Sequence, residues 1–83
     1  MDGSRSSIME ITETLDLTGL KCPLPALLAR RYLMRATAGA QVTVLADDPM
    51  APVDLPHMCH HEGFEVVAIQ QGGGIARMTL RKP

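Results

Sequence analysis

The chain has 83 residues, of which 46% are apolar and 20% are charged, and its formal net charge is −1. This length suits one small domain, which we expect over residues 9–83. The first residues are mostly small and polar, so we expect a disordered tail over residues 1–8. The near-neutral charge excludes a chain-wide field that would favour nucleic acid or a membrane surface. One Tyr and one Phe also leave few aromatic platforms on which RNA bases could stack.

The two cysteines lie far apart in the sequence and do not form the pattern of a disulfide-stabilised secreted domain. No apolar run follows the N-terminal basic residue, so we expect no secretory signal. No stretch is long enough to span a bilayer. We therefore expect a cytoplasmic protein, a monomer without a cofactor, that contacts neither membrane nor nucleic acid.

The first half of the chain predicts a strand, a helix and a second strand. Apolar and polar residues roughly alternate from about Met9 to Asp16, which is typical of a strand. Helical spacing over Leu24–Ala36 predicts a helix that ends at Gly39. Its expected core-facing residues are Leu28, Ala29, Tyr32, Leu33 and Ala36. Alternation over Gln41–Ala46 predicts a second strand, parallel to the first through a right-handed crossover.

The next segment holds three closely spaced prolines: Pro49, Pro52 and Pro56. Because proline disrupts the interior of a helix, this spacing predicts an irregular segment first. A short helix should then begin at about Asp54, with that side chain as the N-cap and Pro56 in the first turn. We expect Gly63 to end this helix.

The last segment predicts a β-hairpin. Two strands, Phe64–Gln71 and Ile75–Lys82, are joined at Gly72-Gly73-Gly74. The inward-facing residues of the second strand should be Ala76, Met78 and Leu80. The element order β-α-β-α-β-β predicts an α/β (α+β) two-layer sandwich with a four-stranded sheet and two helices on one face.

Cys22 is the main candidate for chemistry. It follows a turn at Gly19 and precedes Pro23 and Pro25, which are tolerated in the first turn of a helix. The positive end of that helix, its free N–H groups and the neighbouring Lys21 should favour the thiolate. This position favours a reactive cysteine over a buried structural one, which is the alternative.

The segment Leu15–Pro25 resembles the signature of the TusA/SirA-like sulfur-carrier family, with its Cys-Pro-x-Pro box after a glycine turn. Asp47-Asp48-Pro49 and Asp54–Cys59, which leads to Gly63, match the same family pattern. The resemblance covers the chain from about residue 14 to the end. Where some members carry an acidic or polar residue inside the box, this chain has Leu24.

The resemblance implies a mixed four-stranded sheet and a sulfur carried as a persulfide on Cys22. Gly19, Lys21, Pro23 and Pro25 would shape its surroundings. The sulfur would come from a cysteine desulfurase or a rhodanese and pass to a downstream protein of a sulfur relay, for example towards tRNA thiolation. Such a protein is a sulfurtransferase-type carrier without independent turnover.

Partner docking is expected around the first helix. The candidate residues are Leu24, Leu27, Arg31 and Arg35. The basic residues of this helix fit either an ordinary solvated face or a surface for an acidic partner.

Two other functions remain open from the sequence. A non-catalytic adaptor or regulatory module could keep the fold without ever loading Cys22. A small metal-binding protein could use His57 and His61, which are four residues apart and share a helix face. Two histidines leave a metal site incomplete, so we predict no metal ligands. A disulfide to Cys59 is not expected, because the two cysteines lie on different helices.

Overall fold

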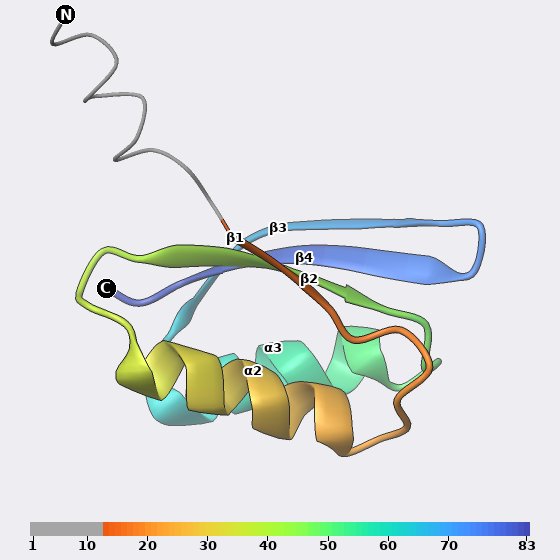
Figure 1. Ribbon diagram of the computed structural model, residues 1–83, viewed down its shortest axis with the longest axis horizontal. Helices are drawn as coiled ribbons and strands as arrows, with labels where there is room; N and C mark the ends of the chain where they lie inside the picture. The colour runs from red at the N-terminus through yellow and green to blue at the C-terminus, as the bar shows by residue number, and fades with distance from the viewer. Residues whose placement is uncertain (1–12) are drawn as a thin grey trace, which may run out of the picture.

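The structure is a computed structural model that describes residues 13–83. Its elements are β1 (Glu13–Asp16), α2 (Leu24–Arg35), β2 (Gln41–Ala46), α3 (Ala51–Glu62), β3 (Glu65–Gly72) and β4 (Ile75–Arg81). Both helices lie on one side of the sheet (Figure 1). The predicted tail, residues 1–8, and the predicted start of the first strand, residues 9–12, lie outside the described residues.

The sheet is mixed and has the order β1-β2-β4-β3. β1 pairs with β2 in parallel, while β4 is antiparallel to both β2 and β3. The predicted two-layer β-α-β-α-β-β sandwich and its parallel first pair are therefore confirmed. The parallel pair matters for function, because the carboxyl ends of β1 and β2 meet at one end of the molecule.

The core lies between the sheet and the two helices. Strand alternation places one face of β2 and β4 against the helices, as predicted for β4. The most buried residues of these four elements are Ala29, Leu33, Val42, Val44, Ala46, Ala51, Leu55, Cys59, Ala76, Met78 and Leu80. The i, i+4, i+8 spacing of the three that belong to α3 produces one continuous apolar stripe.

α2 matches the predicted helix at its start and nearly at its end. Ala29 and Leu33 are fully buried as predicted, while the flanking Leu28 and Tyr32 are half-buried. The prediction that Gly39 ends this helix was wrong. The helix ends at Arg35, and Gly39, with φ of +89°, forms the later turn into β2. That turn is fixed because the Gly39 N–H donates to the Lys82 carbonyl at 2.6 Å.

The predicted break before α3 was also wrong. One continuous helix runs from Ala51 to Glu62, with Pro56 inside it. Asp54 is not its N-cap: it lies in the first turn, where its N–H donates to the Met50 carbonyl at 2.7 Å. Proline removes a single backbone hydrogen bond, and burial of the apolar stripe outweighs that loss. Gly63 ends the helix in the left-handed conformation, as predicted.

The hairpin turn is confirmed. Gly73 and Gly74 both have positive φ, 62° and 79°, and they form a two-residue turn between Gly72 and Ile75, which pair with each other. Two consecutive positive φ angles are typical of the tight turn that matches strand twist. β3 forms an edge of the sheet and carries a β-bulge between Val66 and Ala68.

Candidate functional site

Cys22 is exposed and lies in the loop between β1 and α2, directly before Pro23, the N-cap of that helix. Its peptide bond to Pro23 is cis. The loop faces the segment after β2, because parallel strands deliver their following loops to the same edge of a sheet. Residues 26 to 32 positions apart in the sequence therefore meet around Cys22.

Two consecutive carboxylates after β2 hold the Cys22 loop. Asp47 accepts a hydrogen bond from the Gly19 N–H at 3.0 Å. Asp48 accepts one from the Cys22 N–H at 2.8 Å and, through its other oxygen, one from the Met50 N–H at 2.8 Å. Asp48 thus connects the cysteine to the start of α3. Gly19, one of the predicted supporting residues, contributes its N–H to this contact and lies in a turn with φ of +86°.

A third carboxylate contacts the sulfur itself. The Cys22 thiol donates a hydrogen bond to Oδ2 of Asp54, in the first turn of α3. This bond exists only in the protonated thiol, so it favours the thiol over the thiolate. The bond, a smaller desolvation effect and the negative charges of Asp54 and Asp48 all raise the pKa of Cys22 above its usual value.

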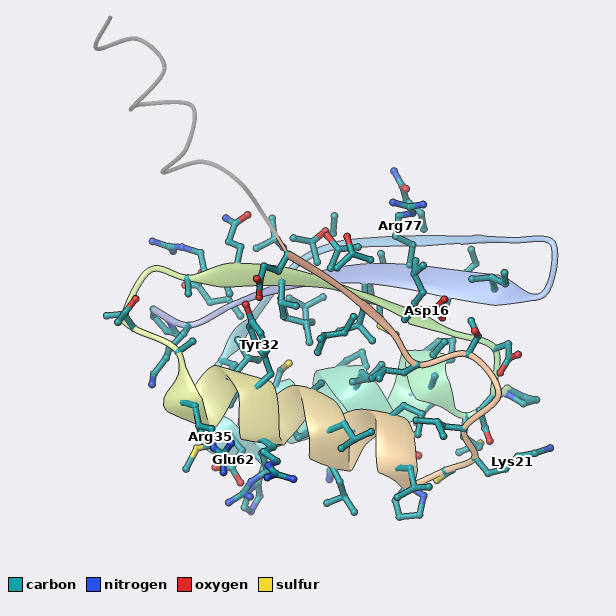
Figure 2. All side chains as sticks on the ribbon, in the orientation of Figure 1. Asp16, Lys21, Tyr32, Arg35, Glu62 and Arg77 are labelled. Carbon is teal, nitrogen blue, oxygen red and sulfur yellow. The ribbon has the colours of Figure 1, made fainter. Side chains whose placement is uncertain are left out.

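The predicted activation of Cys22 by the helix end and Lys21 is therefore wrong. Neither proline of the box has an N–H, the Leu24 N–H donates to the Lys21 carbonyl, and the Cys22 N–H is held by Asp48. The Lys21 side chain extends away from the helices (Figure 2). Its charge acts on Asp48, whose pKa is lowered chiefly by the two backbone N–H bonds and further by Lys21.

The expected docking residues lie along the exposed side of α2. Leu24 and Leu27 are 45% and 52% exposed and lie in the first turn, nearest to Cys22. Arg31 and Arg35 are exposed farther along the helix and border a groove of about 540 Å³. The groove is otherwise lined by Leu15, Leu17, Leu28, Tyr32 and Ala36.

Two contacts of α2 give a structural role to residues near this groove. Tyr32 points from the helix towards β1 (Figure 2), and its hydroxyl donates to the Glu13 carboxylate. Arg30 forms an ion pair with Glu62 at 2.9 Å, which joins α2 to the end of α3. Arg30 therefore serves packing between the helices, while no described residue forms an ion pair with Arg31 or Arg35.

The other cysteine and the histidines are placed apart from Cys22. Cys59 is completely buried in the core, and burial raises its pKa to about 11. His57 and His61 are exposed on α3. Within residues 13–83, no group of three or more His, Cys, Asp or Glu side chains is arranged to hold a metal ion.

The acidic surroundings of the thiol were not predicted from the sequence. Asp47-Asp48-Pro49 was noted only as a match to the family pattern, and Asp54 was expected to be a helix cap. A usable signal was present, because acidic residues directly after the second of two parallel strands must lie near the loop that follows the first. The contact of Asp54 was harder to foresee, since it depends on where α3 begins.

The family model described as sulfurtransferase TusA matches residues 13–82. The chain belongs to the TusA family. A putative sulfur carrier protein of Neisseria meningitidis serogroup A is 39% identical over 70 residues, which are 84% of this chain and 95% of that protein. The sulfur carrier protein TusA of Pseudomonas entomophila is 35% identical over 69 residues, 83% of this chain and 86% of the relative.

A solved structure supports the same family. The SirA-like protein of Desulfitobacterium hafniense superposes with a TM-score of 0.72 at 28% identity, covering 84% of this chain and 96% of that one. The TusA-like chain thus shares both the sequence pattern and the two-layer fold of this group. Neither described helix is long and apolar enough to cross a bilayer.

Proposed function

We propose that this TusA-family protein carries sulfur as a persulfide on Cys22 and passes it between partner proteins. The supporting observation is that the cysteine of the family box, Cys22, is exposed next to the N-terminal end of α2, whereas Cys59 is buried. The matched relatives from Neisseria and Pseudomonas are both named sulfur carrier proteins. A carrier must present its sulfur to two different active sites in turn, and an exposed loop suits that task.

The loading step is an exchange of one sulfur atom. The Cys22 sulfur attacks the outer sulfur of a persulfide on the donor and forms a new S–S bond, while the S–S bond of the donor breaks. The proton from the Cys22 thiol passes to the sulfur that leaves the donor, so the donor ends as a thiol and Cys22 as a persulfide. Discharge to an acceptor thiol is the same exchange in the opposite sense, so neither step needs an external oxidant or reductant.

The partners follow from this chemistry. A cysteine desulfurase or a rhodanese would supply the sulfur, and a protein thiol of a sulfur relay, for example towards tRNA thiolation, would accept it. We place the nearest docking contacts at Leu24 and Leu27, which are exposed one turn from Cys22. Arg31 and Arg35 extend this surface and would favour an acidic partner. The cytoplasmic location stays a prediction.

The direct experiment is loading with cysteine and a cysteine desulfurase, followed by intact-protein mass spectrometry. The wild-type chain should gain one sulfur atom, and Cys22→Ser should gain none because it lacks the accepting sulfur. Cys59→Ala is the matched control, since it removes the buried thiol and should load like the wild type. Loading of Cys22→Ser at the wild-type level would contradict the proposal.

One observation favours a second candidate, an adaptor of the same fold whose cysteine is never loaded. The Cys22 thiol is hydrogen-bonded and its pKa is raised, which lowers its reactivity at neutral pH. The adaptor predicts no sulfur gain from a desulfurase or a rhodanese, although the chain would still bind its partner. The loading experiment therefore separates the two functions.

A further inference from the structure

The contact between Cys22 and Asp54 distinguishes the unloaded sulfur from the loaded one. Asp54 reaches the thiol from a different element, α3, and is the described carboxylate that accepts a hydrogen bond from it. Asp48 uses its two oxygens on the backbone N–H groups of Cys22 and Met50, and Asp47 accepts the N–H of Gly19. Asp54 therefore contacts the reacting sulfur atom, whereas Asp47 and Asp48 hold the Cys22 loop through its backbone N–H groups.

We propose that Asp54 destabilises the persulfide form of Cys22 relative to the free thiol. The equilibrium of the carrier is thereby shifted towards transfer of the sulfur to an acceptor. This inference rests on the proposed function, since it concerns the same persulfide. It assigns Asp54 a role in setting the equilibrium between the loaded and the unloaded carrier, beyond its place in the α3 helix.

The bias follows from the atoms that change during loading. In the unloaded form, Sγ of Cys22 carries a proton and donates it to the carboxylate of Asp54. In the loaded form, Sγ is bonded to Cβ and to the outer sulfur, so it has no proton and this hydrogen bond is lost. The proton has left with the donor thiol.

Charge acts in the same direction as the lost hydrogen bond. A persulfide is more acidic than a thiol, so the outer sulfur of the loaded carrier is largely an anion at neutral pH. Two carboxylates, Asp54 and Asp48, then face a negative charge where a neutral thiol stood before. Both effects stabilise the unloaded carrier relative to the loaded one. Membership of the TusA family does not by itself predict this preference for the unloaded form.

The test measures how sulfur partitions between the carrier and a small thiol. Wild-type and Asp54→Asn chains are equilibrated with glutathione persulfide and glutathione at fixed ratios, and intact-mass spectrometry gives the loaded fraction. Asparagine keeps the shape of aspartate, removes its charge and offers an N–H to the sulfur anion. We expect the equilibrium constant for loading to rise at least about threefold, the scale of a weak charged hydrogen bond near solvent.

The matched control is Glu65→Gln, which also removes one carboxylate charge but lies at the start of β3, where Glu65 forms an ion pair with Arg81 and does not contact the Cys22 loop. It should leave the equilibrium constant within error of the wild type. Asp54→Ala provides a second variant and should shift the constant in the same direction as Asp54→Asn.

The outcomes separate this inference from the proposed function. If Asp54→Asn and the wild type load Cys22 with the same equilibrium constant, or if the variant loads less, the role of Asp54 is refuted and the carrier function stands. An equal shift in Glu65→Gln would assign the effect to net charge and refute the role as well. If the wild type gains no sulfur on Cys22, the proposed function itself fails.

Discussion

At the scale of single residues, the surroundings of Cys22 are governed by carboxylates. The sequence indicated that Cys22 lies in a turn directly before a helix, because glycine and proline patterns constrain the backbone locally. It did not indicate that Asp54, 32 positions away, would contact the sulfur. Local patterns carry no information on how α3 is placed against the loop before α2, and the contact depends on that placement.

The hydrogen bond to Asp54 predicts a pH dependence for the reactivity of Cys22. Because the carboxylate favours the protonated thiol, its removal in Asp54→Asn should lower the pKa of Cys22. The rate of alkylation by iodoacetamide, followed against pH, should therefore rise at a lower pH in the variant. The variant should also react faster than the wild type at pH 7.

Cys59 provides the internal control for this titration, because it is buried and should resist alkylation in the folded chain. Identical pH profiles for Asp54→Asn and the wild type would show that the carboxylate does not act on the thiol in solution. A profile displaced to higher pH in the variant would contradict the sign of the effect.

At the scale of elements, the strands were easier to predict than the helix ends. β2 matches its prediction residue for residue, and the hairpin turn lies where three glycines occur. α3 was predicted too short, because proline was taken to exclude a helix interior. The buried stripe of Ala51, Leu55 and Cys59 was the stronger signal, since tertiary packing outweighs local propensity in most helices.

The C-terminal end of α3 gives a stability prediction. Gly63 has φ of +83°, a conformation that an L-residue adopts at a cost of about 1 kcal/mol. No neighbouring atom lies within 4 Å of a Cβ added there, so the backbone angle alone should set the penalty. We expect Gly63→Ala to lower the free energy of unfolding in urea by about 1 kcal/mol.

Gly72→Ala is the matched control for this change. Gly72 also has open space around an added Cβ, but it lies in β3 and does not have a positive φ. It should cost clearly less than Gly63→Ala. Equal effects of the two substitutions would show that the left-handed end of α3 does not limit stability.

At the scale of the whole molecule, the fold places the exposed Cys22 directly before α2 and the groove bordered by Arg31 and Arg35 along that helix. The thiol lies next to the N-terminal end of α2, and Arg31 and Arg35 lie farther along the exposed side of that helix. The overall architecture could be predicted, because hydrophobic alternation and one right-handed crossover leave few alternatives for six elements. The groove could not, since it forms where β1 and α2 meet and its shape depends on side-chain packing.

This arrangement predicts that charge on α2 controls the loading rate. Arg31→Glu combined with Arg35→Glu should slow loading by a desulfurase about tenfold at low salt, because like charges would then repel an acidic partner. The difference from the wild type should shrink as salt is raised. Loading from glutathione persulfide should remain unchanged, since that donor needs no docking surface.

Arg77→Glu is the control for charge reversal elsewhere. Arg77 is exposed on the side of the sheet opposite the helices (Figure 2), so its reversal should leave enzymatic loading close to the wild-type rate. An equal loss of rate in Arg77→Glu would point to net charge in place of docking on α2. No loss in the α2 variant would remove these two arginines from the docking surface.

The most direct measurement of the central claim is the position of the carried sulfur. After loading by a cysteine desulfurase, proteolysis after Lys and Arg separates the cysteines into the fragments 22–30 and 36–77. We predict that mass spectrometry finds one additional sulfur atom on fragment 22–30 and none on fragment 36–77. Sulfur on the fragment that contains Cys59, or on neither fragment, would contradict the assignment of Cys22 as the carrier.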